Sequence, residues 1–120
     1  MRTMLRTVDD HGVRYDALMF VCPGCETTDA DGTMHGGLHM LPVNTTKKSP
    51  SWTWDGNLDA PTLSPSILTR RGPGADNLPP PFVCHSFLKA GIFEFLGDCT
   101  HQYANQHVPI GELYDWVVSD

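Results

Sequence analysis

Four cysteines in two groups constrain the fold of this chain more than any other feature of its sequence. Cys22 and Cys25 enclose a Pro-Gly pair, whereas Cys84 and Cys99 lie much further along the chain. A C-x-x-C turn directs two sulfurs to one point, which is half of a tetrahedral zinc site with Zn–S distances of about 2.3 Å. The second group can supply the other half, so the fold is expected to bring the two groups together.

The cellular compartment decides between a metal site and disulfides. Residues 1–7 lack the apolar core of a signal peptide, and no run approaches the roughly 20 apolar residues of a membrane helix. We therefore expect a soluble, cytoplasmic protein without a membrane partner. In a reducing compartment such cysteines favour metal ligation, with a redox-active C-x-x-C or simple buried thiols as alternatives.

Length and charge narrow the class of partner. A chain of 120 residues fits a single domain, residues 1–120, whose core is thin for a sequence with so many glycines and prolines. Its 14 acidic and 8 basic residues give a net charge of -6. Recognition of a phosphate backbone requires clustered Lys and Arg, so we expect no nucleic-acid partner.

Strand signals outnumber helix signals along the chain. Residues 15–22 form a compact apolar run that ends at the C-x-x-C turn, and residues 36–43 are predicted to return beside it. Residues 52–57 alternate aromatic and polar side chains before an Asp-Gly turn. Residues 62–68 are predicted to be extended, with Pro65 allowing only an edge strand or a bulge. The predicted fold class is mostly β, a small α+β domain built on antiparallel hairpins.

The clearest hairpin covers residues 82–96, with Ala90-Gly91 as its two-residue turn. In that register Cys84 and Cys99 share one face, and His85 and Asp98 share the other. One face is therefore expected to bind metal and the other to hold a base with its orienting carboxylate. The predicted elements around this hairpin are an exposed loop at residues 70–81, which could cover a site, and one short helix within residues 110–118.

The metal site needs four protein ligands if it is structural. Cys22 and Cys25 are the first two because their spacing sets the geometry, and Cys84 is the favoured third. The fourth is either Cys99 or His39, which lies on the strand returning from the C-x-x-C turn. A closed set of four makes a structural Zn²⁺ site, whereas a catalytic zinc would keep three ligands and a water.

A serine hydrolase site is the chemical hypothesis. Ser64 or Ser66 is the candidate nucleophile, His85 the base and Asp98 the group that orients it. Serines beside a proline often bond only to the backbone of a turn, and His85 could instead support the metal site or pack in the interior. His101 is a further candidate as base, as metal ligand or as a plain loop residue.

The order of short motifs resembles one known family. It runs through CPGC, LHMLP, WDG, PTLSPSI, CHSF and GIFEFLGDCTH, and covers roughly residues 19–110. This order is similar to that of a bacterial and phage family of unknown function whose members are often mislabelled ammonia monooxygenase. Relatives occur beside ubiquitin-like conjugation genes, where the resemblance implies a serine-type peptidase that trims or removes the modifier. Residues 104–108 depart from the family pattern.

The expected function is therefore a small zinc-stabilised hydrolase. We expect a serine-type peptidase that acts on a protein or peptide substrate, the C-terminus of a ubiquitin-like protein or its conjugates. The alternative is a non-enzymatic zinc-binding adaptor of phage or bacterial defence systems, which explains the cysteines and the acidic surface equally well.

Overall fold

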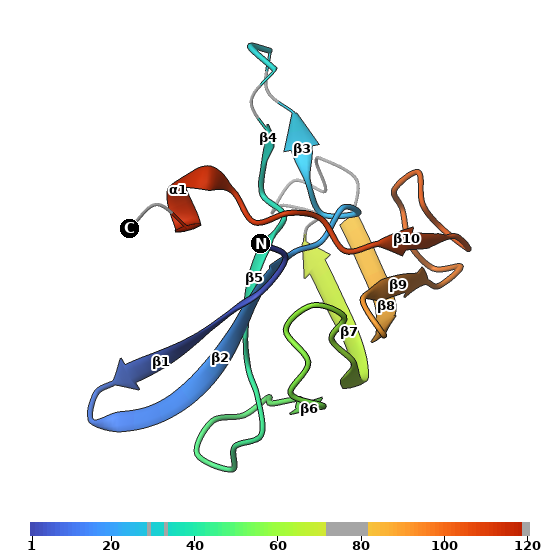
Figure 1. Cartoon of the computed structure of the whole chain (residues 1–120). Helices are drawn as coiled ribbons and strands as arrows, with labels where there is room; N and C mark the ends of the chain where they lie inside the picture. The colour runs from blue at the N-terminus through green and yellow to red at the C-terminus, as the bar shows by residue number, and fades with distance from the viewer. Residues whose placement is uncertain (29, 33, 72–81, 119–120) are drawn as a thin grey trace.

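The computed structural model describes residues 1–28, 30–32, 34–71 and 82–118, which form two antiparallel sheets, a two-stranded ribbon and one short helix (Figure 1). This confirms the mostly β fold class. In chain order the elements are β1 (Met4–Asp10), β2 (Val13–Val21), β3 (Thr27–Thr28), β4 (Met34–His35), β5 (Leu38–Pro42), β6 (Thr53–Trp54), β7 (Leu63–Arg71), β8 (Phe82–Lys89), β9 (Ile92–Phe95), β10 (His107–Pro109) and α1 (Asp115–Val118).

The first sheet has the order β1-β2-β5. β2 and β5 pair antiparallel from Ala17↔Pro42 to Val21↔Leu38, which confirms that residues 36–43 return beside residues 15–22. β1 pairs with β2 and was not predicted. Its sequence MLRTVDD has no period-two apolar pattern, and most of its side chains are exposed. The usual signal of a strand is therefore absent from it.

The second sheet has the order β10-β9-β8-β7-β6. The turn between β8 and β9 contains Ala90 and Gly91, with φ angles of 49° and 76°. It sets Lys89 opposite Ile92, as predicted. The hairpin register is thus confirmed, and alternate residues of β8 point to opposite faces of the sheet.

A bulge interrupts β7 at Pro65. Leu63 pairs with Leu88, but the next pair along the strand is Ile67 with Ser86. The segment between Leu63 and Ile67 therefore stands opposite the single residue Phe87 of β8. This confirms the prediction that Pro65 allows only an edge strand or a bulge, since proline cannot donate to the ladder.

The core lies between the two sheets. The rings of Phe20 on β2 and Phe93 on β9 are 5.9 Å apart, and both side chains are fully buried. Isolated bridges join the sheets at two places, through Val43↔Trp52 and Val21↔Gly111. The sheets therefore enclose the core from both sides.

The second half of β2 is buried on both of its faces. Leu18 and Phe20 face the main core, whereas Met19 and Val21 face a smaller cluster with Leu113 and Val117 of the C-terminal segment. α1 supplies Val117 to that cluster and is shorter than the predicted helix range of residues 110–118. No helix in the described part of the chain is long and apolar enough to cross a membrane.

The predicted loop of residues 70–81 is only partly described. Arg70 and Arg71 belong to β7, and the rest of that range lies outside the described residues.

The hairpin register predicts opposite effects for two adjacent residues of β9. Phe93→Ala removes a ring that is 0% exposed, so the free energy of unfolding should fall by about 3–5 kcal/mol. Ile92 is 37% exposed on the other face, so Ile92→Ala should cost less than about 1 kcal/mol. Urea unfolding of both variants measures this difference. A larger loss for Ile92→Ala would mean that the register is shifted by one residue.

Candidate active site and thiol cluster

Ser66, His85 and Asp98 form a continuous chain of hydrogen bonds. The Oγ atom of Ser66 lies 3.0 Å from Nε2 of His85, and Nδ1 of the same ring lies 3.0 Å from Oδ2 of Asp98. The side chain of His85 is 25% exposed and that of Asp98 is 53% exposed. The three groups therefore lie at a surface that a second molecule can reach.

Strand pairing explains why Ser66 meets His85. Leu68 is the direct partner of His85 across the β7–β8 ladder, so their side chains share one face. Ser66 precedes Leu68 by two residues and points to the same face, within diagonal reach of His85. Ser64, before Pro65, pairs with Thr53 of β6 instead. The structure thus brings Ser66, and not Ser64, to His85.

A turn after β9 carries Asp98 and is bound to the main chain of β8. The N–H of Leu96 donates to the carbonyl of His85, and the N–H of Thr100 donates to the carbonyl of Val83, both at 2.9 Å. Between them, the thiol of Cys99 accepts from the His85 N–H and donates to the His85 carbonyl, each at 3.2 Å. These bonds hold the Asp98 carboxylate beside the His85 ring.

The order of the three groups suits one tautomer of the His85 ring. A carboxylate oxygen can only accept a hydrogen bond, so the tautomer that pairs with a carboxylate carries its proton on Nδ1. Nε2 of the neutral ring is then an acceptor, and the hydroxyl of Ser66 donates to it. A serine whose proton is directed at such a nitrogen can be activated as a nucleophile.

His101 lies elsewhere, against the C-x-x-C turn. Its ring packs edge-on against Phe95 at 4.8 Å, and its Nδ1 accepts the N–H of Tyr103. A Cβ atom added at Gly24 would lie 2.4 Å from Nε2 of His101, so the turn approaches the ring too closely for a side chain there. Burial lowers the pKa of His101. The structure does not join His101 to the hydrogen-bonded chain of Ser66.

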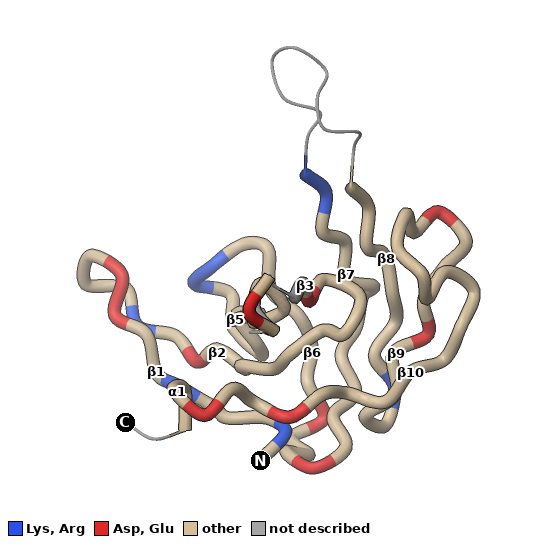
Figure 2. Tube along the Cα trace, turned by 90° about the horizontal axis from the view of Figure 1, so that it is seen from above, with Lys and Arg blue, Asp and Glu red and all other residues tan. Residues whose placement is uncertain are grey.

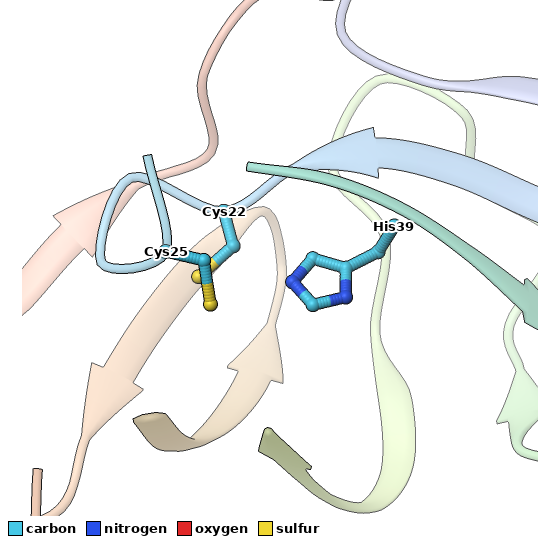
Figure 3. A group of neighbouring side chains, drawn as sticks. All are labelled: Cys22, Cys25 and His39. Carbon is cyan, nitrogen blue, oxygen red and sulfur yellow. The ribbon is translucent and has the colours of Figure 1, made fainter. Parts of the chain in front are cut away.

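Three sulfurs and one imidazole gather on the opposite side of β8. The ligand atoms of Cys22, Cys25 and His39 lie within 4.8 Å of one another, and the His39 ring points toward the two sulfurs (Figure 3). The Sγ atom of Cys84 lies 3.7 Å from that of Cys22. Two sulfurs of a zinc tetrahedron with 2.3 Å bonds are separated by roughly 3.8 Å, so this spacing fits shared coordination.

The protonation of the cluster shows why a cation would suit it. A hydrogen bond with Cys25 raises the pKa of Cys22 to about 12, and a hydrogen bond with Cys22 also raises the pKa of Cys84. The hydrogen bond between Cys22 and Cys25 has the opposite effect on Cys25 and lowers its pKa. The buried cluster thus favours one thiolate over several, because adjacent negative charges repel each other. The three thiols together with His39 make four donors that could bind a metal ion, which would allow the remaining thiols to ionise.

Cys99 is not part of this group. Its thiol is bound to the main chain of His85, as described above, whereas Cys84 reaches the group of Cys22, Cys25 and His39 through its contact with the Cys22 sulfur. Of the two sequence-based candidates for the fourth ligand, the structure places His39 at the cluster. His39 is held there by pairing with Phe20 in the β2–β5 ladder and by stacking on the Phe20 ring.

A family model described as the bacterial ubiquitination-like system serine protease (BubE) matches residues 2–96. The chain belongs to the BubE family. The matched range contains Ser66, His85 and the cluster residues Cys22, Cys25 and Cys84, and it ends just before the Asp98 turn. No curated protein and no solved structure matches the chain. The BubE description agrees with the ubiquitin-like conjugation context expected from the sequence.

The geometry predicts which cysteine is needed for metal. Cys84→Ser should lose most of the bound metal and lower the melting temperature, because it removes one of the clustered donors. Cys99→Ser serves as the matched control and should keep the metal content of the unchanged protein. Elemental analysis of the purified variants measures both. Metal loss in Cys99→Ser with retention in Cys84→Ser would contradict the proposed ligand set.

Proposed function

We propose that this member of the BubE family is a serine peptidase in which Ser66 is the nucleophile, His85 the general base and Asp98 the residue that orients His85. The observation that carries the proposal is the unbroken chain of hydrogen bonds from Ser66 Oγ through both nitrogens of His85 to Asp98. These are the geometric roles that nucleophilic catalysis by serine requires.

The proposed reaction has two steps. His85 Nε2 takes the hydroxyl proton as Ser66 Oγ attacks the scissile carbonyl, and the same nitrogen then donates that proton to the leaving amine. The C–N bond breaks and an acyl ester on Ser66 remains. A water molecule then transfers a proton to His85 and attacks the ester, which releases the carboxylic acid and returns the proton to Ser66. Asp98 stabilises the imidazolium form of His85 in both steps.

The metal in this proposal is a structural Zn²⁺ ion. Cys22, Cys25, Cys84 and His39 would hold it as a closed set of four donors, which supplies stability and no open position for water. The role of these residues is to fix β8 against the C-x-x-C turn and β5. Because His85 follows Cys84 directly, this also fixes the backbone that carries the base.

The proposed substrate is the C-terminal segment of a ubiquitin-like protein or its conjugates. The BubE family description supports a protein partner in a ubiquitination-like system. The exposure of Asp98 and His85 supports a large substrate, because neither residue lies at the bottom of a closed cavity.

Covalent labelling distinguishes the two serines. A fluorophosphonate should label Ser66 in the zinc-loaded protein, and Ser66→Ala should lower peptide hydrolysis by about 10³-fold or more. Ser64→Ala is the matched control, because Ser64 lies two residues away and pairs with β6. It should retain labelling and most of the activity. Mass spectrometry of the labelled peptide identifies the modified residue.

Two outcomes would contradict this assignment. Label on Ser64 would show that the nucleophile is Ser64 and not Ser66. A zinc-loaded, folded protein that takes up no label at any residue would favour the non-enzymatic adaptor over the peptidase.

A further inference from the structure

β7 has an outer edge that begins at Ser66 and that no described strand covers. β8 pairs with one side of β7 along Ile67–Arg71. On the other side, β6 pairs only with Leu63 and Ser64. Among the described residues, the outer edge from Ser66 to Arg71 therefore has no partner strand. An uncovered edge presents unpaired N–H and C=O groups that can pair with another extended chain.

The indole of Trp52 shows which backbone groups face this edge. Trp52 directly precedes β6 and so lies on the outer side of β7, and its indole N–H donates to the carbonyl of Ser66 at 3.3 Å. The Ser66 carbonyl therefore points outward. Because backbone groups alternate sides along an antiparallel strand, those of Leu68 and Arg70 face outward as well.

His85 and Asp98 leave Ser66 Oγ accessible from the outer edge of β7. His85 stands on β8 and approaches Ser66 Oγ from the inner side. The scissile carbonyl must reach Oγ from another direction, and the outer edge provides it. Leu68 stands on the face that carries the Ser66–His85 pair and is 53% exposed, an apolar surface directly beside the reacting atoms.

We propose that the acyl part of the substrate, an extended C-terminal segment of the modifier, binds as an added strand antiparallel to β7 between Arg70 and Ser66. This inference rests on the proposed function and names how that site holds its substrate. β6 and the indole of Trp52 occupy the edge as far as the Ser66 carbonyl, so the chain that pairs with β7 must arrive from the Arg71 end. The scissile bond then lies at Ser66, and the leaving group departs from the sheet.

The charge at the Arg71 end of β7, where the substrate segment would arrive, indicates which side chains that segment carries. Arg70 and Arg71 are both exposed and form a basic end of β7 in a chain of net charge -6 (Figure 2). The guanidinium of Arg71 is held over the ring of Phe82 at 4.3 Å. An added strand spans about 3.4 Å per residue, so these side chains lie about four residues before the scissile bond. Acidic side chains at that position of the substrate would complement them.

N-methylated peptides test strand addition directly. The probes are hexapeptide aldehydes, identical except for one N-methyl group at each position in turn, that compete with a fluorophosphonate for Ser66. Only every second N–H of an added strand faces β7, so N-methylation should weaken protection about tenfold at alternate positions and little between them. A uniform response, no response, or no protection by any of the aldehydes would overturn the inference.

Variants of the edge give a second measurement. Leu68→Pro removes an outward N–H and should weaken protection by the aldehydes about tenfold more than Leu68→Ala, which keeps that N–H. Metal content and the circular dichroism spectrum report whether each variant is folded. Aldehydes with Glu at their first two positions should protect better than those with Gln, and Arg70→Gln should remove that preference. Equal protection in Leu68→Pro and Leu68→Ala would contradict strand addition.

Labelling separates this inference from the proposed function. If Ser66 is labelled but N-methylation has no alternating effect, the peptidase assignment stands and strand addition is wrong. If Ser66 is not labelled, both proposals are wrong.

Discussion

The contact between the sulfurs of Cys22, which directly follows β2, and Cys84 of β8 links the two sheets and holds β8 in place. The two sheets otherwise meet through the apolar core and two isolated bridges. With His39 on β5 and Cys25 in the turn, the cluster links three segments that are far apart in the sequence. A metal ion held by this cluster would add its binding free energy to the stability that the apolar core supplies.

Alternation along β8 connects this stability to the proposed chemistry. Cys84 and His85 are adjacent, and their side chains point to opposite faces of the sheet. Any constraint on Cys84 therefore also limits the movement of the His85 backbone. Cys99 adds a constraint from the other side, because its thiol bonds to both backbone groups of His85 while Asp98 holds the ring. The structure thus separates residues that hold the strand from residues that could react.

Local signals were sufficient for part of this arrangement. The Ala90-Gly91 turn predicted the register of β8 and β9, because Gly91 readily takes the positive φ that such a turn needs. Pro65 predicted the bulge, because proline cannot donate to the ladder. β1 could not be predicted, since its polar sequence pairs only because β2 offers an edge. The choice between Ser64 and Ser66 depends on how the bulge shifts β7, and the choice between Cys99 and His39 depends on a turn outside the hairpin. Both are set by tertiary contacts that a single sequence does not show.

In the proposed mechanism Ser66 performs the chemistry, and the metal cluster only supports it. The rate of fluorophosphonate labelling of Ser66 should therefore be compared between protein loaded with Zn²⁺ and protein loaded with Cd²⁺. Both ions accept thiolate and imidazole donors, but they activate bound water differently. We expect similar labelling rates, with the label on Ser66, in both forms. Labelling at another residue, or a rate that differs by orders of magnitude between folded Zn²⁺ and Cd²⁺ forms, would contradict that mechanism.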